Sequence, residues 1–289
     1  MKLIFSRKGM DSAAGGLASP ILPDGRLLSL PIPGDHAFRL SDWPAPGWDL
    51  EALVHDLSGG RINAQLPVHA DPQLIAPPGE RETWRAALGQ HGAAESHLQA
   101  QGVSAGDCFL FYGWFRQVEL HKGRWRYVPA APNLHVLFGW LRVGKMLDAN
   151  DAVQRESCLR QFPLLAKHPH IADWEQYTKR ANRIYLADQS LRLQGRDFGG
   201  AGHWSHLSLR RVLTWPGQNR SLWRLPAWMA PEKGSRLSAH EKPERWQMSG
   251  RFAQLSNVPR GQEFVLHTPN QRSLKRWLAR VFEDGIAAG

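Results

Sequence analysis

Two stretches, CFLFYGWFRQVEL at residues 108–120 and LHVLFGWLRVGKML at residues 134–147, decide the fold class of this chain. Both are rich in aromatic and β-branched residues, which are typical of strands. A shorter run at residues 123–129, GRWRYVP, returns through the turn HKG. Each long stretch also has a glycine before a tryptophan, and glycine in a strand permits close backbone approach. We therefore predict that the two long stretches are adjacent strands of one central sheet.

The rest of the chain predicts shorter elements around this sheet. Strand-like runs are expected at residues 2–7, 183–187, 206–215 and 262–267, and a hairpin that turns at Pro23-Asp24-Gly25 is expected at residues 21–33. Apolar spacing and end signals predict helices at residues 48–58, 79–102, 173–181 and 270–285. No repeat and no linker is visible. We therefore predict a single α/β domain of mixed α+β type over residues 1–289, with a central mixed β-sheet, β-hairpins, flanking helices and long functional loops.

The composition is that of a globular protein. The chain has 289 residues, of which 42% are hydrophobic and 21% charged, so it can form a sizeable core. No apolar run approaches the ~18 residues of a membrane span, and the start MKLIFSRKG lacks an apolar signal-peptide region. Cys108 and Cys158 stand far apart, which argues against a disulfide scaffold. We expect a cytoplasmic protein with no membrane partner and no obligate protein partner.

Positive charge is concentrated in the last third of the chain. Residues 201–289 contain 14 Lys and Arg side chains against six Asp and Glu, a net charge of +8 within a total of +10. Arginine suits bidentate phosphate contact, and tryptophan can stack on unpaired bases, although most buried tryptophans belong to a core. We therefore predict that about residues 201–282 bind a polyanion such as a nucleic acid, with a basic surface that has no nucleic-acid role as the alternative. The candidate contacts are Arg210, Arg211, Trp215, Arg220, Trp223, Arg224, Gln262, Arg272, Lys275 and Arg276, together with Trp114, Arg116 and Trp140 from the two long strands.

The sequence has none of the common cofactor-binding motifs. It contains no GxxxxGK[ST] loop, no HExxH, no GxSxG and no GxGxxG after a strand. An enzyme with this sequence is therefore expected to work without a cofactor. A metal site is a weaker alternative, because His168 and His170 stand two residues apart and His69 stands two before Asp71. Chance proximity is the simpler explanation in a chain with 13 histidines, and we expect no metal.

The loop that follows the first strand, FSRKGMDSAAGGLASPILPDG at residues 5–25, is crowded with glycines, hydroxyls and opposed charges. A carboxylate among glycines at the end of a strand is a candidate general base, and Asp11 has that position. The groups that could hold an anion or sugar beside it are Arg7, Lys8, Ser12, Gly15 and Gly16. The structural alternative is that Asp11 caps its own turn and pairs with a neighbouring cation.

The same loop carries a family resemblance. FSRKGMDSAAGGLASPILPDGRLLSLPIP closely resembles the leading signature of the nucleotide modification associated domain family, type three. Further segments match along essentially the whole chain: HADP (69–72), FYGWFR (111–116), HVLFGWLRVG (135–144), LTWPGQNRSLWRLPAW (213–228) and GQEFVL (261–266). Met10 replaces the usual aromatic residue after SRKG, which we expect to affect packing only. The resemblance implies action on DNA with modified bases in bacterial or phage settings, without fixing the reaction. It makes double-stranded DNA with modified bases the expected partner, and residues 201–282 the expected DNA-binding portion.

We interpret the chain as a DNA glycosylase that excises a hypermodified or glycosylated base and leaves an abasic site, in defence against phages. Base excision needs no cofactor, and a carboxylate can activate water or stabilise the sugar cation. A flipped base would need an aromatic-rich pocket. Asp11 is the first candidate carboxylate, with Asp71 and Glu263 as alternates. His69 could assist as an acid, and Lys8 could instead form a Schiff base with the sugar.

Other functions stay open at this point. The same residues would serve a transferase or hydrolase that edits the base modification and leaves the glycosidic bond intact. A non-enzymatic reader of modified DNA is another hypothesis, and a metal-dependent nuclease is a weaker one. The outcome of incubation with modified DNA would separate these hypotheses. Released base indicates excision, an altered nucleoside indicates editing, and DNA that is bound but intact indicates a reader.

Overall fold

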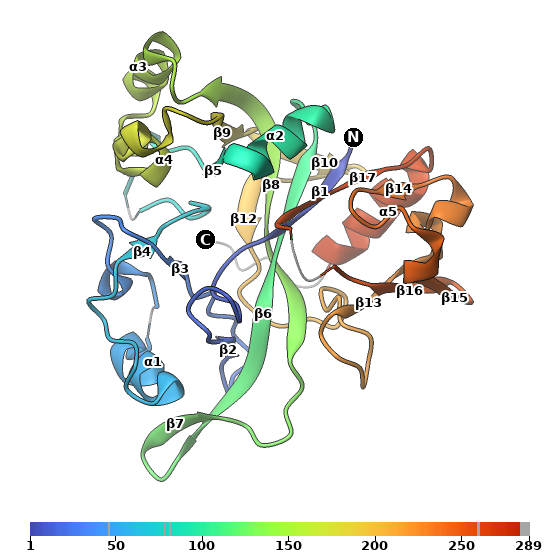
Figure 1. Cartoon of the computed structure of the whole chain (residues 1–289), viewed down its shortest axis with the longest axis horizontal. Helices are drawn as coiled ribbons and strands as arrows, with labels where there is room; N and C mark the ends of the chain where they lie inside the picture. Colours follow the sequence, from blue (N-terminus) through green and yellow to red (C-terminus); the bar gives the residue numbers. More distant parts are fainter. Residues whose placement is uncertain (46, 78, 81, 259–260, 284–289) are drawn as a thin grey trace.

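The computed structural model describes residues 1–45, 47–77, 79–80, 82–258 and 261–283. Within these residues, one sheet of ten strands occupies the middle of the molecule (Figure 1). Its strands are β1 (Leu3–Arg7), β2 (Ser19–Ile21), β5 (Ala87–His91), β6 (Cys108–His121), β7 (Arg124–Tyr127), β8 (Leu134–Asp148), β9 (Asn182–Ala187), β12 (Ala201–His203), β14 (Arg236–Leu237) and β17 (Glu263–His267). The main path runs β14-β17-β1-β6-β8-β9-β5, while β2 and β7 pair with β6 and β12 pairs with β8. The predicted mixed α/β class with a central sheet is confirmed.

Smaller elements surround this sheet. Three small sheets join β3 (Ile32–Pro33) with β4 (Val68–His69), β10 (Ser190–Leu193) with β11 (Arg196–Gly199), and β16 (Phe252–Ser256) with β13 (Leu222–Pro226) and β15 (Trp246–Ser249). The α-helices are α1 (Leu50–Ser58), α2 (Gly92–Ala100), α3 (Ala152–Gln161), α4 (Pro169–Ala172) and α5 (Gln271–Phe282). No helix in the part of the chain that the structure describes is long and apolar enough to cross a membrane.

The two long strands β6 and β8 are neighbours, as the sequence predicts. They pair antiparallel, with one register shift between Phe111 and Tyr112. Their glycines permit close approach: a Cβ on Gly113 would lie 3.0 Å from the Lys8 carbonyl, and one on Gly139 would lie 3.1 Å from the Gly202 carbonyl. Strand β1 pairs in parallel with β6. The chain that leaves β1 is therefore delivered beside Gly113.

The sheet is buried on both faces. Because side chains alternate along each strand, neighbouring residues belong to two different cores. Ile4 and Val265 point to a core that also contains Leu98 of α2, and we call this side the α2 face. Phe5 and Phe264 point to the other core, which contains the apolar side of α5, and we call this side the α5 face. The same alternation decides which polar side chains of β1, β5 and β17 can meet.

Helix α5 confirms the predicted C-terminal helix. Its apolar face is buried at Leu274, Leu278 and Phe282, which recur at the predicted spacing. Gly285, the expected end of the helix, lies outside the described residues. The helix expected at residues 48–58 is also confirmed, as α1, with Asp49 capping its first turn.

Three secondary-structure predictions are wrong. The helix expected at residues 79–102 is a strand, β5, followed by α2 from Gly92. Ala, Leu and Gln favour helices by propensity, but pairing of β5 with β9 overrides that preference. Residues 206–215 make only isolated bridges instead of a strand. The helix expected at residues 173–181 is reduced to one 3-10 turn, Trp174–Tyr177.

Candidate functional site

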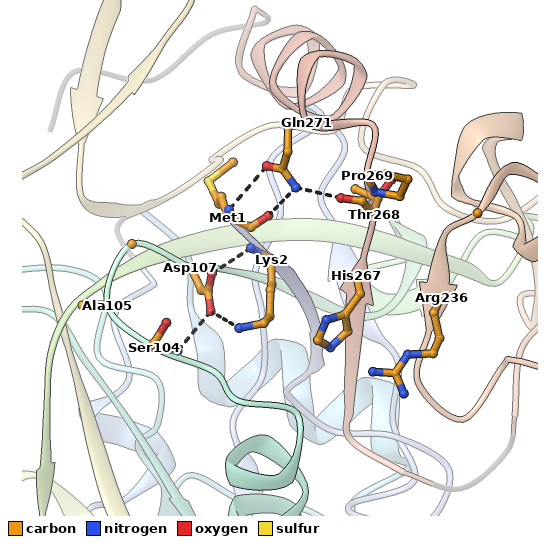
Figure 2. Close-up of a pocket in the computed structure, with 12 residues that line it drawn as sticks. Met1, Lys2, Ser104, Ala105, Asp107, Arg236, His267, Thr268, Pro269 and Gln271 are labelled. Atoms are coloured by element: carbon orange, nitrogen blue, oxygen red, sulfur yellow. Dashed lines mark hydrogen bonds and ion pairs between the residues drawn. The ribbon is translucent and has the colours of Figure 1, made fainter.

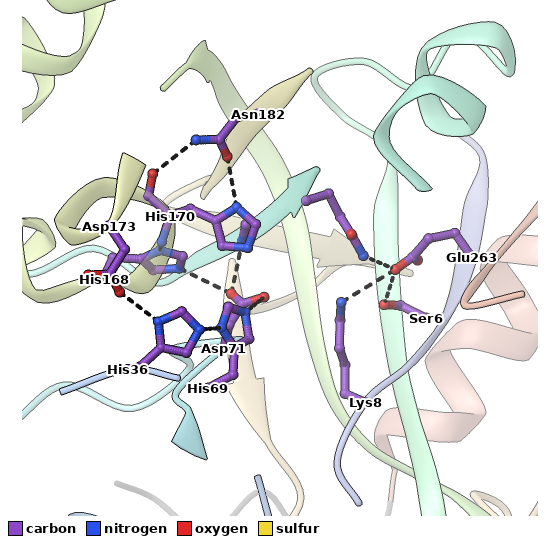
Figure 3. A network of polar contacts seen from close by, with 12 residues as sticks. Ser6, Lys8, His36, His69, Asp71, His168, His170, Asp173, Asn182 and Glu263 are labelled. Atoms are coloured by element: carbon purple, nitrogen blue, oxygen red, sulfur yellow. Dashed lines mark hydrogen bonds and ion pairs between the residues drawn. The ribbon is translucent and has the colours of Figure 1, made fainter. Parts of the chain in front are cut away.

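A buried polar network lies at the end of β1, where β1, β5 and β17 come together through their side chains (Figure 3). Glu263 begins β17, is 4% exposed, and pairs across the strands with Ser6. Its Oε1 accepts hydrogen bonds from Ser6 Oγ at 2.9 Å, from Lys8 Nζ at 3.4 Å and from Gln90 Nε2. Its Oε2 has no partner among the described residues. One carboxylate oxygen is thus fixed, and the other is left for a further ligand.

The strand periodicity explains why these side chains meet. Ser6 follows Ile4 by two positions, Glu263 precedes Val265 by two, and Gln90 follows Leu88 by two. Ile4, Leu88 and Val265 all belong to the core of the α2 face. Residues two apart on a strand share a face, so the three polar side chains project into the same side of the sheet, at the edge of that core.

Burial gives Glu263 an acid strength suited to proton transfer. Removal from water raises the pKa of this carboxyl from 4.5 to about 7, although the Lys8 charge and three hydrogen bonds pull it down. A group with a pKa near the working pH can both give and take a proton efficiently. Glu263 is therefore equipped as a general acid or base near neutral pH.

A second carboxylate, Asp71, stays ionised although it is buried. Its Oδ1 accepts from the backbone amide of Gly89 at 2.8 Å, and His168 Nε2 lies 3.1 Å away. Burial alone would raise the pKa of Asp71, but the hydrogen bond from His168 and the Lys8 charge hold it well below its ordinary value. Lys8 acts on both carboxylates. The Glu263 and Asp71 clusters therefore form one electrostatic unit.

Histidines surround Asp71 on its other sides. His69 Nε2 lies 3.8 Å from Asp71 Oδ2, and His69 Nδ1 lies 2.8 Å from His36 Nε2. His36 Nδ1 in turn lies 2.6 Å from Asp173 Oδ2. The chain Asp173–His36–His69–Asp71 is visible in Figure 3. Burial lowers the pKa of His69 below its ordinary value, although Asp71 opposes this shift. His69 is therefore favoured in its neutral form.

His170 completes this cluster from α4. Its Nδ1 lies 2.8 Å from Asn182 Oδ1, and the amide of Asn182 donates back to the His170 carbonyl at 3.1 Å. Burial lowers the pKa of His170 to about 3. The ring lies directly on Gly89, where an added Cβ would come within 2.3 Å of His170 Cδ2. Glycine at this position of β5 therefore makes room for the ring.

The opening loop has a more structural arrangement than the sequence suggests. Asp11 Oδ1 accepts from the amides of Ala13 and Ala14 at 2.7 and 2.9 Å. The Gly16 amide donates to the Asp11 carbonyl, and Gly15 and Gly16 adopt positive φ angles. Arg7 Nε lies 3.6 Å from Asp11 Oδ2. The structure thus shows the capping arrangement that was the alternative for Asp11, and its carboxylate is occupied in holding the turn.

Several predicted DNA contacts do lie beside this loop. Arg220 Nη2 donates to Ser12 Oγ at 3.2 Å, and the guanidinium lies 4.2 Å from the ring centroid of the half-buried Trp114. The backbone amide of Arg7 donates to the carbonyl of exposed Gln262. We call Arg7, Ser12, Trp114 and Arg220 the loop rim. It lies at the same end of β1 as Glu263.

Other predicted contacts are buried, and this corrects the expectation that they touch DNA. Trp223 is 0% exposed and packs against Phe5, Tyr112 and His135. Trp140 and Arg211 are each 2% exposed. Arg211 donates to the carbonyls of His206 and Val281, so its charge joins two chain segments. These side chains support the fold and offer no surface to a nucleic acid.

The remaining predicted cations are spread away from the network. Arg272, Lys275 and Arg276 are exposed on α5, which packs on the α5 face, opposite to the side that carries Glu263. Arg210 is exposed and paired with Glu283. The other candidates are half-buried: Arg224 over the Phe252 ring, Arg116 over the Tyr127 ring, and Trp215. The basic last third is therefore not one continuous surface around the site.

A separate pocket lies at the opposite end of β1 (Figure 2). It has a volume of about 640 Å³, and Lys2, Asp107, Arg236 and His267 are among its lining residues. Lys2 Nζ lies 3.3 Å from Asp107 Oδ2, and His267 Nε2 lies 3.0 Å from Gln101 Oε1. These polar groups satisfy one another, and none of the predicted catalytic residues lines the pocket. We therefore place the candidate site at the Glu263 and Asp71 clusters.

Sequence reasoning found part of this site and missed the rest. It named Lys8, His69, Asp71 and Glu263, which the structure brings together, but ranked Asp11 above them. It missed Ser6, His36, Gln90, Asp173 and Asn182. Gln90 lies in a segment mistaken for a helix, and the others are single polar residues without a motif. Alternation of Ile4 with Ser6 and of Glu263 with Val265 is the one signal that could have paired the two strands.

The chain is similar over most of its length to one known family. A family model described as nucleotide modification associated domain 3 matches residues 2–267. The match includes Glu263, Asp71 and all the histidines around them, and it confirms the resemblance seen in the sequence motifs. No curated protein and no solved structure gave a match.

Proposed function

Because this chain belongs to the nucleotide modification associated domain 3 family, we propose that it is an enzyme that cleaves a glycosidic bond in DNA with modified bases. The bond we propose is the N-glycosidic bond of a hypermodified or glycosylated base, so that an abasic site remains. The family supports a role connected with modified nucleotides. The setting we propose is the cytoplasm, in defence against phages whose DNA carries such bases.

The observation that carries this proposal is the opposite pKa shift of two neighbouring buried carboxyls. Glu263 has its pKa raised to about 7, while Asp71 has its pKa held well below the ordinary value. Glycoside hydrolysis uses such a pair, one carboxyl protonated and the other ionised. When two carboxyls have pKa values that their surroundings push apart, the one with the higher pKa can serve as the acid and the one with the lower pKa stays an anion.

The reaction then has a balanced form. Glu263 gives its proton to the leaving base as the bond between the base and sugar C1′ breaks. Asp71 remains negative and stabilises the positive charge that develops on the sugar. A water molecule adds to C1′ and returns a proton to Glu263. The products are the free base and an abasic deoxyribose.

Contacts around Glu263 suit this role. Lys8, Ser6 and Gln90 all bind the same oxygen, Oε1. The proton of the neutral carboxyl is therefore best placed on Oε2, which has no partner among the described residues. Hydrogen bonds to Oε1 hold the carboxyl in place and orient the proton on Oε2, which stays available for transfer.

The loop rim is the part of the molecule that would contact the DNA backbone. Arg7 and Arg220 are cationic, and the Arg220 guanidinium covers one face of the Trp114 ring. Phosphate contacts position a nucleic acid, and an aromatic ring can stack on a base taken out of the duplex. The rim lies where the β1 chain leaves the sheet, next to Lys8.

The test is incubation of the full chain with DNA from phages that carry different base modifications, alongside unmodified DNA. Mass spectrometry of the soluble products would detect released base, and alkali treatment would cleave the strand at abasic sites. We expect release only from modified DNA. Recovery of an altered nucleoside would instead indicate editing of the modification. Modified DNA that is bound but chemically unchanged would overturn the proposed cleavage and favour a reader.

A further inference from the structure

We propose that His69, Asp71 and His170 form a binding site for one divalent transition-metal ion. Each residue offers one ligand atom, and the three atoms lie within 4.8 Å of one another. This inference goes beyond the proposed function, because proton transfer by Glu263 needs no metal, and an ion bound to Asp71 would offset the negative charge that the proposed function uses to stabilise the sugar cation. It joins His69 and Asp71, one of the two pairs that the sequence spacing suggested, with His170 from the other pair, and it leaves out His168.

Hydrogen bonds leave one nitrogen of His170 available. The Asn182 amide donates its N–H to the His170 carbonyl, which turns Asn182 Oδ1 toward His170 Nδ1. An amide oxygen only accepts, so Nδ1 carries the hydrogen. The Nε2 lone pair is then the one left for a metal. Metal-binding histidines commonly donate their other N–H to a fixed oxygen in this way.

The same reasoning applies to His69. The Asp173 carboxylate accepts from His36 Nδ1, and in the tautomer that carries its hydrogen there His36 has an accepting Nε2. That nitrogen accepts from His69 Nδ1 at 2.8 Å. The Nε2 atom of His69 is then unprotonated and lies 3.8 Å from Asp71 Oδ2. A carboxylate–histidine chain behind a ligand fixes its tautomer and orientation.

Asp71 also has one oxygen to spare. Its Oδ1 takes the Gly89 amide and the His168 Nε2–H. The His168 tautomer is set because its Nδ1 accepts from the His170 amide at 3.3 Å. Both contacts use Oδ1, which leaves Oδ2 on the side of His69. His168 is therefore a supporting residue, and it fixes the carboxylate that would bind the ion.

Two histidines and one carboxylate are a ligand set for zinc and for non-haem iron in catalytic sites, where further positions stay open for water or substrate. Zinc–ligand bonds of about 2.0–2.2 Å place tetrahedral ligand atoms roughly 3.4 Å apart. The three ligand atoms, which lie within 4.8 Å of one another, would therefore have to move only slightly closer together to bind an ion. Purely structural zinc sites usually have four protein ligands. The geometry therefore points to a site that is open to a small ligand.

The experiment measures metal binding directly, without DNA. The full chain is treated with a chelator, and Zn²⁺ or Co²⁺ is added back in calorimetric titrations and thermal-unfolding scans. We expect one ion per chain and a rise in Tm with metal concentration. The absence of both in the wild-type chain would overturn the proposal without recourse to any variant.

Variants locate the site. His69→Gln and His170→Gln should each weaken Zn²⁺ binding by at least about 100-fold, and Asn182→Ala, which removes only the support of His170, by about 10–100-fold. His121→Gln, at the exposed end of β6, is the matched control and should bind as the wild type does. Equal binding by all four variants would place the ion elsewhere and contradict the proposal. Base release from DNA is assayed separately, so a failure to bind metal and a failure to release base can be told apart.

Discussion

The side chain of Gln90 donates a hydrogen bond to Glu263, although their strands β5 and β17 stand near opposite ends of the path through the main sheet. Four strands, β1, β6, β8 and β9, lie between β17 and β5 along that path. The sheet must therefore curve so that the strands near its two edges approach each other. This curvature makes a buried site from residues that are 173 positions apart in the chain.

Replacing Glu263 with Gln should abolish most of the proposed base release. Gln keeps the size and an accepting oxygen for Lys8 and Gln90, but it has no proton to give. Loss of a positioned general acid costs about 10²–10⁴-fold in rate. The measurement is released base per enzyme under single-turnover conditions. Asp11→Asn, in the turn of the loop, is the comparison, and a larger loss there than in Glu263→Gln would contradict the assignment of the acid.

The activity should fall as pH rises through about 7. In the proposed reaction Glu263 acts in its protonated form, and its pKa lies at about 7 because burial disfavours the charged carboxylate. Above that pH, kcat/KM should decrease about tenfold per pH unit. Lys8→Met removes a charge that lowers this pKa, so the midpoint should move to higher pH. Lys2→Met, at the far end of β1, is the control and should leave the midpoint in place.

The free energy of unfolding should also depend on pH through Glu263. The folded-state pKa of Glu263 is raised from 4.5 to about 7, so its favourable contribution is complete below pH 4.5 and is lost as pH rises toward 7. Gln does not titrate. The unfolding free energy of Glu263→Gln relative to wild type should therefore increase by about 3 kcal/mol between pH 4.5 and pH 8. Urea unfolding at several pH values measures this, and a flat difference would show that Glu263 has an ordinary pKa.

Gly89→Ala should disturb the site through His170. The added methyl would come within 2.3 Å of the His170 ring, and overpacking of this kind costs about 1–3 kcal/mol. In a His170→Ala background the ring is gone, so the same substitution should cost much less. A double-mutant cycle of unfolding free energies separates this contact from a general effect on β5. Equal costs in both backgrounds would place the strain elsewhere.

Arg220→Ala should weaken binding to modified DNA. The guanidinium is held over Trp114 and bound to Ser12, so it can meet a phosphate with little loss of side-chain freedom. Loss of one phosphate contact should reduce the slope of log binding constant against log salt by about 1. Arg126→Ala, in the exposed hairpin where Arg126 pairs with Glu119, is the matched control. Fluorescence-anisotropy titrations at several salt concentrations would show whether the two variants differ.

The local patterns were strong enough to predict the framework. Aromatic and β-branched runs identified β6 and β8, and regular apolar spacing identified α5, because both signals come from neighbouring residues that share one buried face. Strand β5 gave no such signal. Its residues Ala87–His91 have helical propensity, and only pairing with β9 makes them extended. The error mattered, since β5 brings Gly89 and Gln90 to the site.

By itself, the sequence determined the fold class, the family and the residue types available for chemistry, since these depend on composition, periodicity and motif. Only the tertiary structure decided which of those residues work together. It used Asp11 to hold a turn, buried Trp140, Trp223 and Arg211, and placed Lys8 where its charge acts on both Glu263 and Asp71. The physical reason is that the curvature of the sheet and the side of each strand set burial and distance. Burial and distance then set the pKa values, which no local pattern encodes.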